Sequence, residues 1–280
     1  MVSLHGRFVW YELHTTDAKA AAAFYTKVVG WGARDASQSD RSYTIFTVGQ
    51  AAVSGLMTLS EEARERGATP CWIGYVGVDD VDAAAQRTKA LGGAVNFPPT
   101  DIPNVSRFSV IADPHAAMLA LVKWVDPGRA QQVQFGQPGR VGWHELLAGD
   151  SETAMAFYSA LFDWRKGNAE TGPMGTYQLF SVGGHNIGGM FNKPPMVPVP
   201  FWLYYFDVPD IDVAAERVKA AGGEIVEGPG PVPGGWILRA MDPQGAMFAL
   251  MGARTSKAVG YFERSAPRNP SDQRSKRWSW

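Results

Sequence analysis

The sequence contains a single cysteine, Cys71, among its 280 residues. A lone cysteine excludes a disulfide within the chain and a structural metal site built from several thiolates. No apolar run approaches the ~20 residues that a helix needs to cross a bilayer. Residues 1–10 lack the charged and then apolar pattern of an export signal. We therefore expect a cytoplasmic protein that makes no contact with membranes.

Several common nucleotide-binding and catalytic motifs are missing as well. The sequence has no P-loop, no Gly-x-Gly-x-x-Gly after a strand and no Gly-x-Ser-x-Gly elbow. Charged residues make up only 19% of the chain, and the net charge is −1. Residues 253–280 nevertheless hold seven Lys or Arg against two acidic residues. Because no basic helix or aromatic platform accompanies this tail, we expect it to be flexible and solvated and expect no nucleic-acid partner.

An internal repeat organises the residues that are present. Trp10 and Asp17 have identical counterparts 133 residues later, at Trp143 and Asp150. Further segments match in the same order, namely 42–49 with 176–183, 71–75 with 201–205, 79–93 with 209–223, and 112–114 with 241–243. The repeat unit therefore spans roughly 120 residues.

The repeat predicts two domains of similar structure. We place the first domain at residues 1–125 and the second at 140–252. Residues 126–139 are rich in proline and glycine, which indicates a linker. Residues 253–280 form the basic tail.

Each repeat reads twice as a strand, a helix and three further strands. Asp150 is a suitable N-cap for a helix whose apolar residues recur every three or four positions, and Gly30 is a suitable helix end. Residues 44–48 and 51–57 flank a Gly-Gln turn and predict a hairpin. The chain is therefore expected to be α+β, with four βαβββ modules that form two cupped half-barrels. The first module could pair with the second and the third with the fourth, or the first with the fourth and the second with the third.

These residues resemble the vicinal oxygen chelate superfamily, which includes glyoxalase I, bleomycin-resistance proteins and extradiol dioxygenases. The resemblance covers residues 7–252, and no single piece of it is specific. It rests on the ordered recurrence of segments 17–31, 78–81, 91–93 and 113–114, and of their partners 150–164, 221–223 and 242–245. The Trp-x-Glu-Leu opening is most similar to a tandem branch of hydroxylase-like and mycobacterial antigen-type proteins. The resemblance implies small-molecule binding on the concave face of a sheet.

The resemblance also implies a divalent metal ion on that face, but the sequence departs from the ligand pattern. Metal-dependent members place the first ligand seven residues before the helix-capping Asp and the last ligand seven residues after the Asp-Pro turn. The corresponding positions here hold Trp10 and Trp143, and Ala120 and Ala249. The two remaining positions fall near Ile73 and Leu203 and within 55–57 and 189–191. Since indole and alkyl groups supply no donor atoms, we predict no metal and no other cofactor.

Two glutamates remain as candidate acids or bases. Side chains alternate along a strand, so Trp10, Glu12 and His14 share one face, as Glu145 does in the second copy, where Leu147 replaces His14. A half-buried carboxylate beside tryptophan tends to have a raised pKa and can act as a general acid or base. The alternative is a carboxylate paired with arginine or with backbone N–H groups.

Five other residues are candidates for contact with a ligand. Trp10 and Trp143 could stack on a flat molecule, or could simply fill the space left by the metal. Tyr75 and Tyr205 occupy matching positions and could donate hydrogen bonds or line the core. Arg107 would attract an anion if it faced the cup, but a salt bridge on the sheet is an equal alternative.

The histidines offer little sign of a metal site. His144 is adjacent to Glu145 on a strand, so the two side chains lie on opposite faces. We expect most of the histidines at the solvated surface. Only His14 has an inward path, and a nonstandard divalent-metal site formed with Glu12 stays an alternative.

Three functions remain at this stage. The first is a metal-free protein that binds a small, flat or apolar molecule in one or both cups. The second is a lyase, isomerase or hydroxylase that uses Glu12 or Glu145 as acid or base. The third is a degenerate scaffold that acts through its surface or its tail. Because two repeats already form a pseudo-dimer, the chain could be a monomer or a homodimer.

Overall fold

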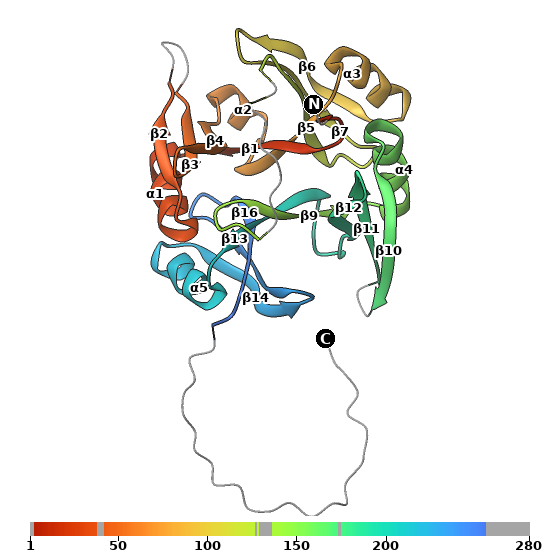
Figure 1. Cartoon of the computed structure of the whole chain (residues 1–280). Helices are drawn as coiled ribbons and strands as arrows, with labels where there is room; N and C mark the ends of the chain where they lie inside the picture. Colours follow the sequence, from red (N-terminus) through yellow and green to blue (C-terminus); the bar gives the residue numbers. More distant parts are fainter. Residues whose placement is uncertain (1–2, 38–41, 127, 129–135, 173–174, 256–280) are drawn as a thin grey trace, which may run out of the picture.

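A computed structural model describes residues 3–37, 42–126, 128, 136–172 and 175–255. Figure 1 shows two layered units, the first copy of the repeat mainly in red to yellow and the second in green to blue. The first copy contains β1 (Phe8–Thr15), α1 (Ala18–Val29), β2 (Gly32–Asp35), β3 (Thr44–Val48), β4 (Ala51–Thr58), α2 (Glu61–Glu65), β5 (Cys71–Gly77), α3 (Val81–Ala90), β6 (Ala94–Ile102), β7 (Ser106–Ala112) and β8 (Met118–Trp124). The second contains β9 (Val141–Ala148), α4 (Ser151–Phe162), β10 (Arg165–Gly172), β11 (Gly175–Val182), β12 (His185–Asn192), β13 (Phe201–Val208), α5 (Ile211–Ala220), β14 (Glu224–Val232), β15 (Gly235–Met241) and β16 (Met247–Gly252).

Each copy forms one eight-stranded mixed sheet. The strand orders are β2-β3-β4-β1-β5-β8-β7-β6 and β10-β11-β12-β9-β13-β16-β15-β14. The opening strands of two modules lie antiparallel at the centre of each sheet, and each of them pairs in parallel with the last strand of its own module. The first module therefore pairs with the second and the third with the fourth. The predicted α+β fold of two cupped sheets is confirmed.

The helix boundaries follow from capping residues that the sequence supplies. The carboxylates of Asp17 and Asp150 accept hydrogen bonds from the third backbone N–H of α1 and α4, which satisfies a donor that the helix itself cannot pair. Helix α1 ends at Gly30, whose φ of 87° suits a residue without a side chain. Helix α4 ends at Asp163 with a φ of 59°, a left-handed conformation that aspartate tolerates better than most residues.

The two copies share one hydrophobic core, which lies between the sheets. Helix α1 contacts α5 and β13 of the second copy, and α4 contacts α3 of the first. Figure 1 shows α1 and α4 at opposite ends of this shared layer. Phe24 and Phe157 each lie against a glycine of the other copy, at Gly223 and Gly93, where a Cβ would clash with the ring. Each helix thus completes the core of the other copy, and the concave faces of the sheets are left free for other uses.

Polar groups cross this core in a symmetric pattern. The hydroxyl of Tyr25 donates to Asp242 at 3.0 Å, and that of Tyr158 donates to Asp113 at 3.2 Å. The same carboxylates accept backbone N–H groups of their own Asp-Pro turns. The Asp-Pro residues therefore act as turn residues, and they also anchor the other copy.

His144 lies in this core, so the expectation of a solvated surface is wrong for this residue. Its side chain stacks on Phe8 with ring centroids 3.9 Å apart. Its Nδ1 is 2.6 Å from the carbonyl of Ile187, and its Nε2 is 2.6 Å from the hydroxyl of Tyr11. Burial lowers the pKa of His144 to about 4, an effect that the hydrogen bond to Ile187 only partly offsets. As predicted, its side chain lies on the opposite face from Glu145.

Two further features complete the description. The short helix α2 was not predicted; Ser60 caps it by accepting a hydrogen bond from the N–H of Ala63. Most of the predicted linker and nearly all of the predicted tail lie outside the described residues. Within the described part of the chain, no helix is long and apolar enough to cross a membrane.

Candidate functional site

Each sheet carries a polar cluster on the face turned away from the shared core. We call the cluster of Trp10, Glu12, His14, Tyr43 and Tyr75 cup one. We call the cluster of Trp143, Glu145, Tyr177, Tyr205 and Arg239 cup two. In both cups the opening strand supplies the tryptophan and the glutamate, because alternate residues of a strand project to the same face.

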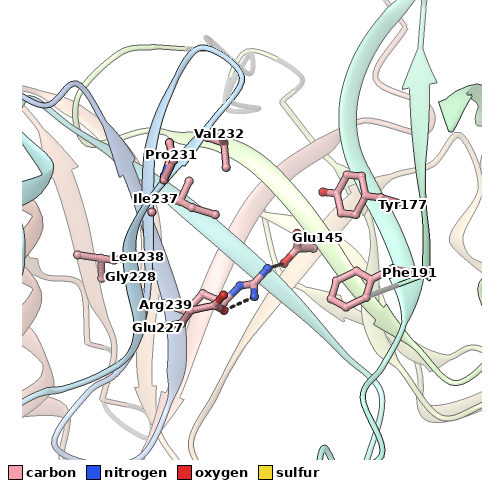
Figure 2. A pocket seen from close by; sticks show the side chains of 12 residues that line it. Glu145, Tyr177, Phe191, Glu227, Gly228, Pro231, Val232, Ile237, Leu238 and Arg239 are labelled. Carbon is pink, nitrogen blue, oxygen red and sulfur yellow. Dashed lines mark hydrogen bonds and ion pairs between the residues drawn. The ribbon is translucent and has the colours of Figure 1, made fainter. Parts of the chain in front are cut away.

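Cup two is built around an ion pair between Glu145 and Arg239. The guanidinium Nη2 donates to Oε2 of Glu145 at 2.7 Å, and the hydroxyl of Tyr205 donates to the same oxygen at 2.8 Å. Nε of Arg239 donates to the Tyr205 hydroxyl at 3.0 Å. Nη1 of Arg239 also pairs with Glu227, so one cation joins two carboxylates, as Figure 2 shows. The Glu145 side chain is 6% exposed and that of Glu227 is 62% exposed, so the inner carboxylate is the fixed one.

Burial and the charge of Glu145 keep the tyrosines of cup two protonated. Burial raises the pKa of Tyr205 well above 10, and the negative charge of Glu145 raises it further. The same two causes act on Tyr177, whose hydroxyl accepts the indole N–H of Trp143 at 2.9 Å. Both tyrosines are therefore hydrogen-bond donors at neutral pH, not acids. Glu145, the buried carboxylate of the cup, is held by the guanidinium of Arg239.

A cavity of about 300 Å³ opens beside this network. Figure 2 shows Tyr177 and Phe191 on one side of the ion-paired residues and the β14–β15 residues on the other. The charged lining residues are Glu145, Glu227 and Arg239, and the larger uncharged ones are Tyr177, Phe191, Pro231, Val232, Ile237 and Leu238. Its size falls at the lower end of small-molecule sites, and its make-up of mostly apolar walls with a few convergent polar groups is typical of them.

Cup one surrounds the matching carboxylate with neutral donors and an imidazole. Oε1 of Glu12 lies 3.0 Å from Nε2 of His14 and accepts the hydroxyl of Tyr75 at 3.0 Å. Oε2 accepts the hydroxyl of Tyr43 at 2.7 Å. The indole of Trp10 donates to Tyr43 at 3.4 Å, the counterpart of the Trp143–Tyr177 bond. Each oxygen of Glu12 is therefore bonded, although the residue is only 7% exposed.

The expectation of a raised carboxylate pKa is wrong for Glu12. Burial raises its pKa, but the hydrogen bond and charge of His14, with the hydroxyls of Tyr43 and Tyr75, outweigh burial and lower the pKa. Glu12 is therefore ionised at neutral pH and is a poor general acid. Glu145, for its part, has the arginine partner that the sequence left open as an alternative.

Arg107 does not belong to either cup. Its side chain pairs with Asp82 of α3 at 2.7 Å and with Asp101 of β6 at 3.0 Å. Ser109 and Ile111 lie two and four residues further along β7, so their side chains are on the same face of the sheet as that of Arg107. Both are buried, and Ile111 packs in the shared core. The salt bridge expected as an alternative is what the structure has, and the suggested role in anion binding is corrected.

Sequence reasoning missed Arg239, Glu227, Tyr43 and Tyr177 as site residues. Arg239 pairs in register with Ala249, the position reached by counting seven residues from the Asp-Pro turn. Pairing the two arms of that hairpin across the Asp-Pro turn would have placed Arg239 opposite Ala249 and therefore on the cup face. Tyr43 immediately precedes β3 and Tyr177 lies near the start of β11, in segments that matched across the repeat, but nothing local showed that the two side chains reach over a neighbouring strand.

The remaining predicted residues have the following placements. Trp10 is 8% exposed and packs edge-on against Trp124 with centroids 6.1 Å apart, so it fills cup one more than it lines an open surface. Trp143 is half-buried. Tyr75 and Tyr205 both donate to the glutamate of their cup.

The residues at the family's metal positions do not fit a divalent ion. Trp10 and Ala120 offer no donor atom. At Gly55, the hydroxyl of Tyr43 occupies the space above β4, and a Cβ there would clash with it. Gly189 lies under the ring of Tyr177 in the same way. Among the described residues, no group of three or more His, Cys, Asp or Glu side chains could hold a metal ion. A metal site would need Glu12 or Glu145 to give up its present partners.

Comparisons with known proteins agree with this architecture. A family model of the Glyoxalase/Bleomycin resistance protein/Dioxygenase superfamily matches residues 7–121 and 140–250. The protein named "Putative glyoxylase CFP32" of Mycobacterium tuberculosis is 34% identical over 246 residues, covering 86% of this chain and 93% of that protein. The "Anthracycline biosynthesis protein DnrV" of Streptomyces peucetius is 29% identical over 262 residues, covering 89% of this chain and 94% of that protein.

Solved structures share the fold at low sequence identity. The Mn(II)-bound glyoxalase from Novosphingobium aromaticivorans has a TM-score of 0.61 at 16% identity, covering 92% of this chain and 90% of that one. The 2,2',3-trihydroxybiphenyl 1,2-dioxygenase of Sphingomonas wittichii has a TM-score of 0.62 at 13% identity, covering 89% of this chain and 91% of that one. With both repeats matched by the family model, the chain belongs to the glyoxalase/bleomycin resistance protein/dioxygenase superfamily.

Proposed function

We propose that the chain binds a small organic molecule in cup two. The observation that carries this proposal is the cavity of about 300 Å³ beside the Glu145–Arg239–Glu227 network. A buried ion pair that spans two modules fixes the polar end of the site, and the apolar side chains opposite it supply most of the contact area. The other described residues that the sequence predicted as site residues make contacts within the protein.

The charges of cup two favour a ligand with a positive charge or with hydrogen-bond donors. Two carboxylates face one guanidinium, so the network carries a net charge of −1 when all three groups are ionised. Each nitrogen of Arg239 donates one hydrogen bond, to Tyr205, Glu227 or Glu145, and the two carboxylates already offset its charge, which disfavours an anion. Glu227 lies at the rim with a largely exposed side chain, and it is the group most accessible to an incoming cation or hydroxyl.

The walls favour a flat, apolar body for the same ligand. Phe191 and Tyr177 stand opposite Ile237 and Pro231 in Figure 2, and Tyr177 and Phe191 lie with ring centroids 5.9 Å apart. An aromatic ring between these walls would bury apolar surface on both faces. One relative is named for anthracycline biosynthesis, and this name supports a polycyclic aromatic ligand but does not identify the compound.

This binding function requires no metal ion. The donor set of cup two is committed to an ion pair, and general acid–base chemistry by Glu145 would first require that pair to break. We therefore favour binding over lyase, isomerase or hydroxylase activity in this cup. Elemental analysis of protein purified without chelator tests the point, since a stoichiometric divalent ion would contradict it. A cytoplasmic location and a monomeric or homodimeric state remain predictions from the sequence.

A series of naphthalene compounds tests the proposed site. Calorimetric titration should rank 2-naphthylmethylamine above 2-naphthylmethanol, and the alcohol above 2-naphthoic acid, with roughly tenfold separating the amine from the acid because one carboxylate in the cup is uncompensated. Glu227→Gln should reduce the preference for the amine. Glu62→Gln, at an exposed glutamate of α2, is the matched control and should leave the ranking unchanged.

Equal affinity for the three compounds in the wild-type protein would contradict the charge argument. Binding that survives replacement of Ile237 by Asp, while the protein keeps its melting temperature, would place the ligand outside cup two.

A further inference from the structure

The last strand of the second sheet ends close to the cavity of cup two. Gly252, the final residue of β16, pairs in register with Trp236, and Trp236 pairs with Pro231, which lines the cavity. Arg254 follows, with its guanidinium 4.3 Å from the ring centre of Trp236 and an ion pair to Asp212. The chain therefore leaves the sheet beside the β14–β15 hairpin, which forms one wall of cup two.

The basic tail that follows contains the chemical groups for which cup two is suited. Residues 274–280 lie outside the described part of the chain, and their sequence is Arg-Ser-Lys-Arg-Trp-Ser-Trp. Three of these residues are cationic, two are tryptophans and none is acidic. An indole supplies a flat apolar body, and the arginine next to it supplies a positive charge and several N–H donors.

The walls of cup two complement both groups. Glu145 and Glu227 carry two negative charges against the single positive charge of Arg239. The Glu227 side chain is 62% exposed, so a second guanidinium can reach it from solvent. Tyr177 and Phe191 present ring surfaces on the opposite side of the cavity, as Figure 2 shows. The cavity of about 300 Å³ is large enough for a small aromatic group between these walls.

We infer that Trp278 and Arg277 of the same chain occupy cup two when no other ligand is bound. The indole of Trp278 lies between the walls of the cavity, and the guanidinium of Arg277 pairs with Glu227. This inference rests on the proposed binding site in cup two and adds a competitor that the chain itself supplies. The tail thereby regulates the site, because a small molecule binds only by displacing it.

The covalent connection makes a weak contact sufficient. The 21 residues 256–276 connect Thr255 to Arg277 and span up to ~70 Å when extended. A tethered segment of this kind has an effective concentration on the order of 1 mM. If the free segment binds with a Kd of about 0.1 mM, the tethered one weakens every external ligand roughly tenfold. A competitor lowers all apparent affinities alike, so the ranking of the naphthalene compounds is unchanged.

Calorimetric titration of the full-length chain with 2-naphthylmethylamine tests the competition. Trp278→Ala should tighten binding roughly tenfold, because the competing indole is gone. Arg264→Gln, which removes a positive charge elsewhere in the tail, is the control and should bind as the wild-type protein does. Equal affinity in Trp278→Ala and wild-type protein would overturn the inference and leave the compound ranking, and with it the proposed function, intact. An equal gain in Arg264→Gln would reveal a general charge effect and would also overturn it.

Methyl NMR of the protein without added compound gives a second readout, which does not depend on naphthalene binding. The ring current of an indole in cup two should shift the methyl signals of Ile237, and Trp278→Ala should remove that shift. Ile73, which packs with Trp10 and Tyr75 in the first sheet, is the control and should not move. Identical Ile237 signals in the two proteins would overturn the inference. A shift that grows with protein concentration would place the tail of a second copy in the cup and would also overturn it.

Discussion

Cup one and cup two are both built around a buried glutamate, but the glutamate has different partners in the two cups. The partner of Glu12 is His14, which lies two residues further along the same strand. Glu145 takes its partner from β15, in the other module of the sheet, through Arg239. The local partner leaves the far wall of cup one apolar, whereas the distant partner brings a charged network and Glu227 into cup two. One backbone arrangement used twice thus offers two different chemistries, and the difference lies in which strand supplies the partner of the carboxylate.

The most severe test of this comparison removes the cation of cup two. Arg239→Met leaves Glu145 buried without its charged partner, and we expect the free energy of unfolding to fall by about 3–5 kcal/mol. Urea unfolding at neutral pH measures the loss. The double variant Glu145→Gln with Arg239→Met removes both charges and should recover most of it. If the single and double variants were equally destabilised, the ion pair would not be what stabilises cup two.

The copies also differ where they meet, at the matching positions Tyr11 and His144. The pKa of His144 is about 4 in the folded protein against an ordinary value of 6.5, so the unfolded state binds the extra proton first. The stability due to neutral His144 is complete above pH 6.5 and is lost as the pH falls from about 6.5 to about 4, to a total of about 3 kcal/mol.

Urea unfolding between pH 7 and pH 5 checks this dependence on His144. The variant His144→Gln, which cannot titrate, should lose less stability over this interval than the wild-type protein. His185→Gln is the exposed control and should follow the wild-type slope. Parallel slopes for His144→Gln and wild-type protein would contradict the assignment.

A smaller effect is expected when cup one loses its imidazole. His14→Leu removes the contact that most lowers the pKa of Glu12, so this pKa should rise, and stability at neutral pH should fall by about 1–2 kcal/mol. Carbon NMR of the Glu12 carboxyl measures the titration. The carboxyl of Glu145 should be unaffected, and a shift there would mean that the cups are coupled through the shared core.

The weakest effect should come from Arg107. Its ion pairs with Asp82 and Asp101 lie on the helix side of the first sheet and are solvent-exposed. Surface pairs of this kind contribute little. Arg107→Met should therefore leave ligand binding in cup two unchanged, as measured with the naphthalene series. A loss of affinity would show that this arginine reaches a ligand.

Much of the fold follows from the sequence because its signals are local and occur twice. The 133-residue offset aligned β1 with β9, and capping at Asp17 and Asp150 fixed the start of two helices. The pairing of modules was not readable, since both arrangements satisfy the same strand and helix patterns. It depends on the antiparallel contact of β1 with β5, which no local pattern encodes.

The site was predicted less well, for the same physical reason. Glu12 and Glu145 were found because alternation along one strand places them. Arg239 and Tyr177 were missed because each reaches Glu145 or its neighbours from another strand. The pKa of Glu12 was given the wrong direction because burial alone was considered, whereas His14 on the same strand and the hydroxyls of Tyr43 and Tyr75 outweigh it. Contacts within an element are predictable from sequence; contacts between elements require the sheet register.

The number of naphthylmethylamine molecules bound per chain tests the difference between the cups most directly. Our account predicts one molecule per chain in a calorimetric titration of the wild-type protein, with the heat of binding strongly reduced by Glu227→Gln. Two equivalent sites per chain, unaffected by that substitution, would show that the cups share one chemistry and would contradict the account.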